Sequence, residues 1–153
     1  RIVCIWRMEL GAVITAAGIW FYCSTTDRCL YLLRNDPKHP YTWGLPGGKS
    51  EKSETLIQTL QRECKEEIGF FPVHKKIIPI EQFTSADKRF SFHTFFCVVE
   101  EEFVPSLNYE HLGYAWIESR TWPRPMHPGL WATVNFHEII QKIETAKQNY
   151  TSQ

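Results

Sequence analysis

The sequence lacks the paired cysteine spacings that build disulfide-rich domains and zinc sites. It contains no CxxC pair, and its number of cysteines is odd. Both properties argue against a disulfide framework and against a structural zinc site. A reducing compartment is therefore expected, and we predict a cytoplasmic protein. The five cysteines are Cys4, Cys23, Cys29, Cys64 and Cys97.

The sequence also lacks an excess of charge of either sign. Lysine plus arginine and aspartate plus glutamate number 17 each, so the formal net charge at pH 7 is zero. No overall basic field is present to attract long nucleic acid, so a small ligand is the more natural partner. The chain has no internal repeat, linker or low-complexity segment. We therefore expect one domain over residues 1–153.

No apolar run is long enough to cross a bilayer. The best candidate, residues 10–23, follows Arg1 and Arg7 and superficially resembles a signal peptide, but a span needs about 20 apolar residues. Its richness in Ile, Val, Trp, Phe and Tyr favours a buried strand, with Gly11 and Gly18 as candidate bulges. No membrane partner is therefore expected. The chain begins with Arg1 and not Met, and the sequence leaves open whether residues precede it.

The rest of the chain alternates apolar runs with turn signals. A hairpin is predicted over about 14–34, because a turn-like TTDR separates two apolar runs. Loops with several prolines are predicted at 35–41 and 122–129. Further strands are expected at 76–85, 90–99 and 114–117, and an amphipathic helix is expected at about 133–147. Strands around one central helix, with a closing helix, predict an α/β (α+β) sandwich.

The central helix follows a glycine-rich loop in the stretch from Trp43 to Phe70, WGLPGGKSEKSETLIQTLQRECKEEIGF. Near its end Glu63, Glu66 and Glu67 share one face, since positions i, i+3 and i+4 lie within about 100° of one another. Three like charges repel, and helix stability does not require them. A hard divalent cation such as Mg²⁺ would turn that repulsion into binding. The cluster is therefore predicted to hold a metal, in preference to being a solvated acidic face.

The opposite side of this helix is predicted to be buried. Its apolar stripe consists of Leu56, Ile57, Leu60, Cys64 and Ile68. The stripe assigns Cys64 to the core as a small hydrophobe, because the sequence suggests no histidine partner for a catalytic thiol. Ser53 stands where the helix N-cap is expected.

The same stretch resembles the Nudix box. Gly48, five residues, Glu54, seven residues and then Arg62 through Phe70 fill every position of that motif, with Cys64 and Phe70 in its two apolar slots. A chance match in a chain this short is on the order of one in a million or rarer. The chain is therefore identified as a member of the Nudix hydrolase superfamily. The resemblance implies the Nudix fold, a mixed β-sheet packed between helices.

The resemblance also implies roles for particular residues. The metal ligands it implies are the carbonyl of Gly48 and the side chains of Glu63, Glu66 and Glu67. It further implies that Arg62 orients Glu63 and that Glu54 is a supporting or secondary metal residue. Eight residues of helix would separate Glu54 from Arg62 by roughly 12 Å, which is long for a direct ion pair.

The implied reaction is hydrolysis of a phosphoanhydride by water attack at phosphorus, dependent on Mg²⁺, with Mn²⁺ as a possible substitute. A carboxylate must take the proton of the attacking water. Glu66 or Glu67 could serve, and so could Glu110 in the loop before the short strand that contains Trp116. The sequence leaves this choice open.

The resemblance implies a small nucleotide-type substrate: ADP-ribose, a dinucleoside polyphosphate, a nucleotide sugar or a nucleoside triphosphate. Arg34 and Lys49 could bind its phosphate oxygens, and His127 could line its pocket. Each of the three could instead be an ordinary surface residue. A homodimer is possible because the aromatic N-terminal strand could pair across an interface.

A catalytically silent nucleotide-binding or sensor module on the same fold is the alternative. Such a module would be expected to lose at least one of the three glutamates, whereas this chain keeps all of them. An isoprenoid diphosphate isomerase would need a catalytic Cys–Glu pair, which the sequence does not show. We therefore favour the hydrolase.

Overall fold

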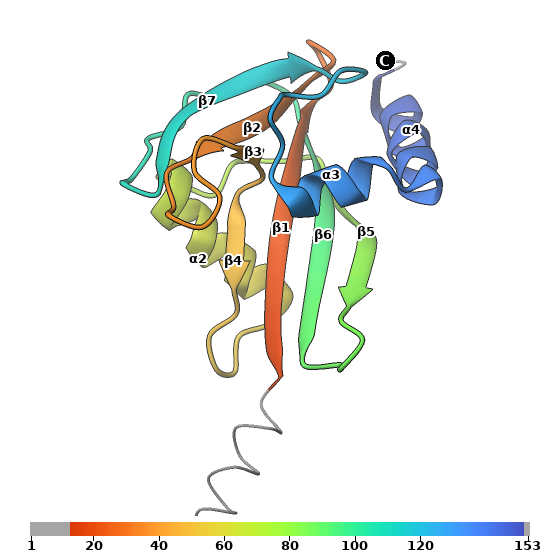
Figure 1. Ribbon diagram of the computed structural model, residues 1–153. Coiled ribbons are helices and arrows are strands. Elements are labelled where there is room, and N and C mark those ends of the chain that lie inside the picture. The colour runs from red at the N-terminus through yellow and green to blue at the C-terminus, as the bar shows by residue number, and fades with distance from the viewer. Residues whose placement is uncertain (1–12, 152–153) are drawn as a thin grey trace, which may run out of the picture.

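The computed structural model describes residues 13–151 and contains one mixed seven-stranded sheet with helices on both faces (Figure 1). This architecture confirms the predicted sandwich class. In chain order the elements are β1 (Ile14–Cys23), β2 (Arg28–Arg34), β3 (Trp43–Gly44), β4 (Gly47–Lys49), α2 (Leu56–Ile68), β5 (Lys76–Thr84), β6 (Phe90–Val99), β7 (His111–Glu118), α3 (Pro128–Val134) and α4 (His137–Thr151).

Strands β1 and β6 run parallel at the centre of the sheet. The sheet order is β3-β2-β1-β6-β5, with β4 also paired to β1 and β7 paired to β2. The predicted hairpin is confirmed, since β1 and β2 pair antiparallel through Tyr22 and Cys29. The predicted strands near the positions of β5, β6 and β7 are confirmed as well. β4 therefore carries the glycine loop directly onto the central strand.

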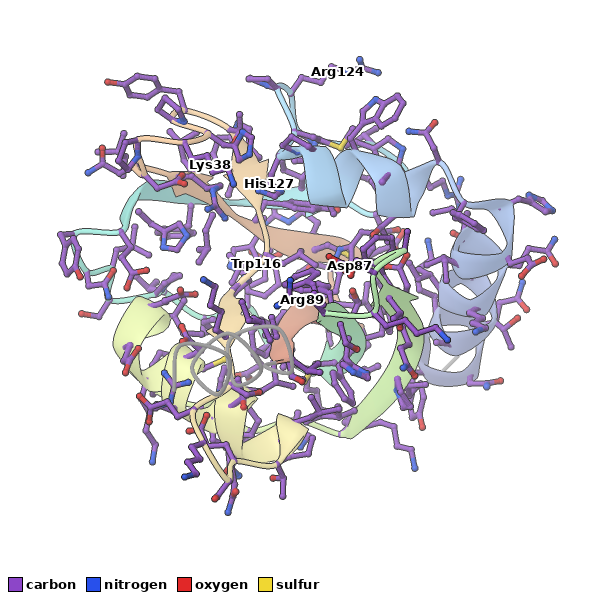
Figure 2. The ribbon with its side chains drawn as sticks, turned by 60° about the horizontal axis from the view of Figure 1, so that its bottom comes forward. Lys38, Asp87, Arg89, Trp116, Arg124 and His127 are labelled. Atoms are coloured by element: carbon purple, nitrogen blue, oxygen red, sulfur yellow. The ribbon has the colours of Figure 1, made fainter. Side chains whose placement is uncertain are left out.

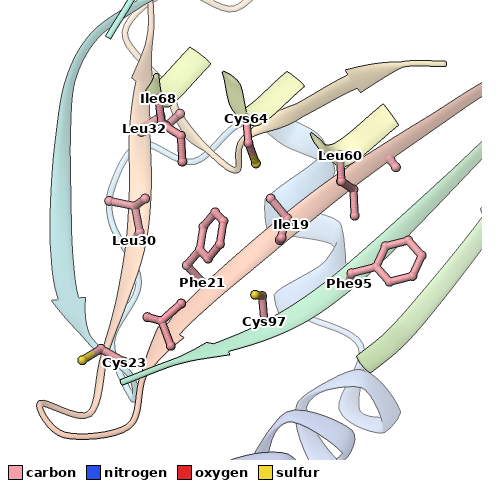
Figure 3. Close-up of a cluster of buried hydrophobic side chains, with 12 residues drawn as sticks. Ile19, Phe21, Cys23, Leu30, Leu32, Leu60, Cys64, Ile68, Phe95 and Cys97 are labelled. Carbon is pink, nitrogen blue, oxygen red and sulfur yellow. The ribbon is translucent and has the colours of Figure 1, made fainter. Parts of the chain in front are cut away.

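Side-chain alternation along the strands divides the interior into two cores. On β1, Ile19 and Phe21 belong to the core under α2, whereas Trp20 and Tyr22 belong to the core on the opposite face. Helices α3 and α4 contribute to that second core. Figure 3 shows the first core, in which α2 contributes Leu60, Cys64 and Ile68.

Helix α2 begins after Thr55, so the predicted N-cap at Ser53 is wrong. Thr55 Oγ1 accepts the backbone N–H of Gln58 at 3.1 Å, and Gln58 Oε1 accepts that of Thr55 at 2.9 Å. This reciprocal capping box satisfies two backbone donors at the helix start. Ser53 instead has a φ of 70°, which belongs to a turn before the helix. Gly69, with a φ of 94°, ends the helix as a left-handed C-cap.

The predicted apolar stripe of α2 is confirmed except at one position. Leu60, Cys64 and Ile68 are fully buried, and Leu56 packs partly buried against the same core. Ile57, in the first turn of the helix, is 40% exposed. Cys64 is thus a core residue, as predicted, and burial raises the pKa of its thiol.

Gly18 is a regular ladder residue, so the predicted bulge there is wrong. The β1–β6 register runs without interruption past the pair Gly18–Thr94. The glycine is needed for packing, because a Cβ at this position would lie 2.9 Å from Cζ of Phe92. The predicted strand start at Leu10 and the candidate bulge at Gly11 lie outside the described residues.

The single C-terminal helix predicted over 133–147 is in fact two helices. α3 starts inside the predicted loop, with His127 as N-cap and Pro128 in its first turn. Proline is compatible with that position because its missing N–H would have no helical partner there. Asn135 ends α3, and its side chain donates from Nδ2 to the carbonyl of Trp131 at 2.7 Å. α4 then begins at His137.

The four cysteines in the described range are buried and form no disulfide bond; they are Cys23, Cys29, Cys64 and Cys97. Among the described residues, no helix combines the length and apolar character that a bilayer span requires.

Candidate metal-binding active site

The glycine loop and helix α2 meet at Gly47 and Gly48. A Cβ on Gly48 would lie 2.6 Å from Oε1 of Glu63, so only glycine lets the loop approach this carboxylate. Gly47 has a φ of 149°, and a Cβ on it would collide with the backbone oxygen of Ala17. These two residues therefore fix the backbone of the loop against both the helix and β1.

Glu67 is the most buried carboxylate of the predicted cluster. It is 3% exposed, and its Oε1 accepts the backbone N–H of Gly47 at 2.9 Å. Burial, together with the charges of Glu63 and Glu110, raises the pKa of Glu67 to about 9, although the hydrogen bond from Gly47 opposes the shift. A negative charge at Glu67 thus needs a nearby positive charge that the surrounding side chains do not supply.

Glu63 is held from the other side by Arg62. Nη1 of Arg62 lies 2.9 Å from Oε1 of Glu63, which is the contact that the resemblance implied. Glu63 is 8% exposed, and burial raises the pKa of its carboxyl although Arg62 opposes the shift. Glu66 is different, because its side chain is 48% exposed and only 3.5 Å contacts link it to Nη1 of Arg62.

Arg62 also pairs directly with Glu54, so the prediction that these residues are too far apart is wrong. The Arg62 Nε–Glu54 Oε2 distance is 2.7 Å, and Nη2 donates to Glu54 Oε1 at 3.0 Å. The prediction assumed that both residues lie on the helix, whereas α2 starts only at Leu56. Glu54 folds back in the preceding turn, where it accepts the N–H of Glu51 at 2.7 Å. Arg62 Nη2 also donates to the carbonyl of Lys49 at 2.8 Å, which ties the helix to the loop.

Glu110 reaches the same region from the turn before β7. Its backbone N–H donates to Oδ1 of Asn108 at 2.9 Å, and its carbonyl accepts the N–H of Asn35 at 3.0 Å. Because its charge contributes to the raised pKa of Glu67, the two carboxylates lie within electrostatic reach of each other. The structure thus brings Glu110 toward the helix carboxylates across more than forty residues of sequence.

The carboxylates suit a divalent cation, although they do not form a preassembled metal site. Within residues 13–151, no group of three or more histidine, cysteine, aspartate or glutamate side chains is arranged to hold an ion. Two buried carboxylates with raised pKa values, beside a glycine that leaves room at Glu63, are the donor set that a hard cation prefers. The residues fit Mg²⁺ or Mn²⁺, with Glu66 needing to turn away from Arg62 to join them.

Arg34 and His127 both lie next to Gly44. A Cβ on Gly44 would be 3.7 Å from Cδ of Arg34 and 3.7 Å from Cβ of His127. Arg34 pairs with Asp36 through distances of 2.9 and 3.1 Å. Two of the three predicted substrate residues are thus neighbours, while Lys49 has an exposed side chain on β4.

The ring of His39, which the sequence did not single out, contacts the ring of His127. The two rings are 4.8 Å apart and nearly perpendicular. Burial is the main reason that the pKa of His127 is lowered to about 4. The charges of Arg34, His39 and Lys38 contribute to the same shift. Figure 2 shows His127 and Lys38 together near the start of α3. His39 comes from the segment NDPKHPY, whose prolines indicated only a loop.

Comparison with known proteins agrees with this geometry. The chain matches the NUDIX domain family over residues 13–134. It is 28% identical over 127 residues to the human protein named 8-oxo-dGDP phosphatase NUDT18, covering 83% of this chain and 37% of that protein. The mouse protein of the same name is 37% identical over 51 residues, covering 33% of this chain and 16% of that protein. This chain therefore spans well under half the length of these relatives.

Solved structures show the same fold. The MutT protein from Methanosarcina mazei Go1 has a TM-score of 0.54 and 27% identity, covering 70% of this chain and 78% of its own. An Ap4A hydrolase from C. elegans has a TM-score of 0.61 and 18% identity, covering 90% and 100%. The NUDIX domain of Shewanella oneidensis NrtR, complexed with ADP ribose, has a TM-score of 0.62 and 16% identity, covering 93% and 91%. With a family match over most of its length and with this fold, the chain belongs to the Nudix hydrolase superfamily.

Proposed function

We propose that this chain hydrolyses the phosphoanhydride of a nucleoside diphosphate linked to another group, with Mg²⁺ as cofactor. One observation carries the proposal: Glu63 and Glu67 are buried with raised pKa values at the glycine loop, with Glu110 in electrostatic reach. Such a cluster is costly in a purely structural role, because like charges in a low-dielectric site repel. A bound cation offsets that cost.

We assign metal binding and proton transfer to different residues of the chain. Glu63, Glu66 and Glu67, with the Gly48 carbonyl, hold the cation, and Arg62 keeps Glu63 in place. When bound, Mg²⁺ neutralises the diphosphate and lowers the pKa of a water molecule. Glu110 takes the proton from the attacking water, because it approaches the cluster from a separate turn and forms no ion pair with an arginine or lysine of residues 13–151.

Substrate recognition is proposed from the surrounding residues and from the relatives. Their names mention 8-oxo-dGDP, Ap4A and ADP ribose, which are all nucleotides with a phosphoanhydride. Arg34 and Lys49 provide positive charge for phosphate oxygens, and His127 lines the side next to Gly44. A sensor module on the same fold is less favoured, since all three glutamates are present.

A substrate panel tests the proposal. The purified chain is incubated with 8-oxo-dGDP, Ap4A, ADP-ribose and a nucleotide sugar in Mg²⁺, in Mn²⁺ and in EDTA, and the products are identified by mass. Hydrolysis in H₂¹⁸O places the label on the phosphorus that is attacked. We expect cleavage of at least one compound that requires the metal.

Two variants connect that activity to the site. Glu67→Gln and Glu110→Gln should each lower kcat by at least about tenfold, since general-base and metal-ligand contributions are typically this large or larger. Glu101→Gln changes an exposed carboxylate and serves as the control. Absence of cleavage in every condition, or unchanged kcat in Glu67→Gln, would refute the proposed function.

A further inference from the structure

The sheet face that carries α3 and α4 is not covered along its whole length. Figure 1 shows both helices beside the upper parts of β1, β6 and β5, while no other element of residues 13–151 covers the lower parts of these strands on that side. Three phenylalanines lie there: Phe83 is 53% exposed, and Phe90 and Phe92 are partly exposed. Their ring centroids are 6.5 Å apart for Phe83 and Phe90 and 6.4 Å apart for Phe90 and Phe92. We call this group the aromatic surface.

The strand register connects the aromatic surface to the glycine loop. Cross-strand partners share a sheet face, and the register pairs Phe83 with Phe92, Phe92 with Ala16 and Ala16 with Lys49. Since neighbouring strands are about 4.8 Å apart, Lys49 lies roughly 10 Å from Phe92 across two strand spacings. Lys49, whose side chain leaves β4 on this face, can therefore bind a phosphate of a nucleotide whose base lies on the aromatic surface, while Gly48 faces Glu63 on the other side of β4. Ala16 lies between Lys49 and Phe92. Gly18 in the next row adds no side chain, so the Phe92 ring can lie where a Cβ on Gly18 would be 2.9 Å from its Cζ.

A carboxylate borders the aromatic surface. Glu81 pairs with Thr94 in the row beyond Phe92, and it follows a β-bulge after Pro79. Thr133 of α3 donates its hydroxyl to Oε1 of Glu81 at 2.7 Å, and Thr94 donates to the same oxygen at 3.4 Å. Oε2 accepts no hydrogen bond from any residue that the structure describes. One oxygen of Glu81 is thus fixed by protein and the other is left to accept from a ligand.

We propose that Glu81 recognises the nucleobase of the substrate and that this base is of the guanine type. Guanine carries two neighbouring donors, its ring N1–H and its exocyclic N2 amine, and both can point at a carboxylate oxygen while the ring stacks on phenylalanine. Adenine would turn the lone pair of its N1 toward the same oxygen, and the two acceptors repel. The inference rests on the proposed function, because a substrate phosphate bound by Lys49 positions the base.

Thr133 is a positioning residue in this arrangement. Its hydroxyl oxygen lies 2.7 Å from Glu81 Oε1 and 3.1 Å from the carbonyl oxygen of Gly129, so its single proton is shared between the carboxylate and the α3 backbone. Without that hydrogen bond, the Glu81 carboxylate is free to rotate, and its Oε2 is no longer held in one direction. Thr133→Val should therefore weaken selection between bases without removing the acceptor itself.

The first test compares matched substrates. kcat/KM is measured with Mg²⁺ for dGDP and dADP, using wild type, Glu81→Gln, Thr133→Val and the control Glu101→Gln. Wild type should prefer dGDP, and Glu81→Gln should lower that preference by about tenfold or more, as expected for a hydrogen bond to a charged group. The change should be in KM for dGDP, with the values for dADP nearly constant. Thr133→Val should lie between wild type and Glu81→Gln, and Glu101→Gln should match wild type.

The second test does not depend on catalysis. Calorimetric binding of GMP and AMP is measured in EDTA, with melting curves to confirm that each variant is folded. Selective GMP binding that is lost in Glu81→Gln supports the inference. Equal binding of GMP and AMP by wild type, or retained selectivity in Glu81→Gln, overturns it whatever the hydrolysis assay shows. Selective GMP binding by a chain that hydrolyses nothing would instead refute only the proposed hydrolase activity.

Discussion

The carboxylates of Glu63 and Glu67 are buried on one side of α2, whereas Glu66 from the same cluster is half exposed. Burial disfavours their charged forms, and Arg62 reaches Glu63 at 2.9 Å but makes no ion pair with Glu67. The difference between the three glutamates arises from the glycine loop, which covers two of them and leaves the third at the rim. The proposed cation would complete the charge balance of the buried pair.

Gly48→Ala tests whether the loop must approach Glu63 this closely. The added Cβ would lie 2.6 Å from the Glu63 carboxylate, so either the loop or the side chain must move. Because displacement of a reacting group by about 1 Å costs up to about a hundredfold, we expect kcat/KM to fall by at least about tenfold. Gly113→Ala is the control, since a Cβ there meets nothing within 4 Å. Equal activity of the two variants would contradict the role of Gly48.

His111 gives the fold a dependence on pH. It is 9% exposed, and its Nδ1 is buried without a hydrogen-bond partner among the described residues. Burial and the charge of Arg34 together lower the pKa of His111 from 6.5 to about 4, although the charge of Asp36 opposes this shift. The folded state therefore binds its proton less tightly than the unfolded state. Its contribution is fully present above pH 6.5 and is lost as the pH falls toward 4, by up to about 3 kcal/mol.

The measurement is urea unfolding at pH 7 and at pH 4.5. His111→Gln should show a smaller loss of unfolding free energy between these two pH values than wild type, because glutamine does not titrate. His137→Gln, which changes an exposed histidine, should behave as wild type. If His111→Gln lost as much stability on acidification as wild type, another group would have to carry the effect.

Among the secondary-structure elements, α2 depends on how it starts. The capping box at Thr55 fixes where the helix begins, and this start leaves Glu54 outside the helix to fold back on Arg62. Had the helix begun after Ser53, Glu54 would have lain inside it, about two turns from Arg62. The position of one threonine therefore decides whether Arg62 is anchored.

Thr55→Ala and Ser53→Ala distinguish the two possible caps. Removal of the Thr55 hydroxyl should lower the free energy of unfolding by about 1 kcal/mol, since Gln58 loses the acceptor of its N–H. Ser53 provides no such cap, so Ser53→Ala should change stability by less than half of this amount. Chemical denaturation of both variants gives the comparison. If Ser53→Ala lowered the free energy of unfolding more than Thr55→Ala, Ser53 and not Thr55 would be the N-cap.

For the molecule as a whole, the sheet separates the core under α2 from the core under α3 and α4. The carboxylates proposed to bind the metal belong to α2, while α4 packs on the opposite face through side chains that include Ile139 and Ile143. Stability can thus be changed on one face while the carboxylates on the other keep their arrangement.

Ile143→Ala tests this separation. The residue is 4% exposed, and truncation of a buried isoleucine typically costs about 2–5 kcal/mol of unfolding free energy. We expect a clearly lower melting temperature, with kcat changed less than about twofold when it is measured well below that temperature. A large fall in kcat for the still-folded variant would show that the two faces are coupled.

The sequence by itself determined the features that depend on short separations along the chain. The i, i+3, i+4 spacing placed Glu63 and Glu67 on one helical face, and the turn-like TTDR between two apolar runs predicted the hairpin of β1 and β2. The Nudix box gave the family, and the stripe on α2 assigned Cys64 to the core. These predictions succeeded because helical and strand periodicities are local.

Only the tertiary structure decided which distant residues meet. The ion pair of Arg62 with Glu54, the edge-to-face contact of His39 with His127 and the approach of Glu110 to Glu67 all depend on turns and strand pairings. The start of α3 was likewise missed, because Pro128 in the first turn of a helix resembles a loop signal. Contacts of this kind bring together residues that no periodic pattern relates, so they are set by how the sheet is ordered and covered.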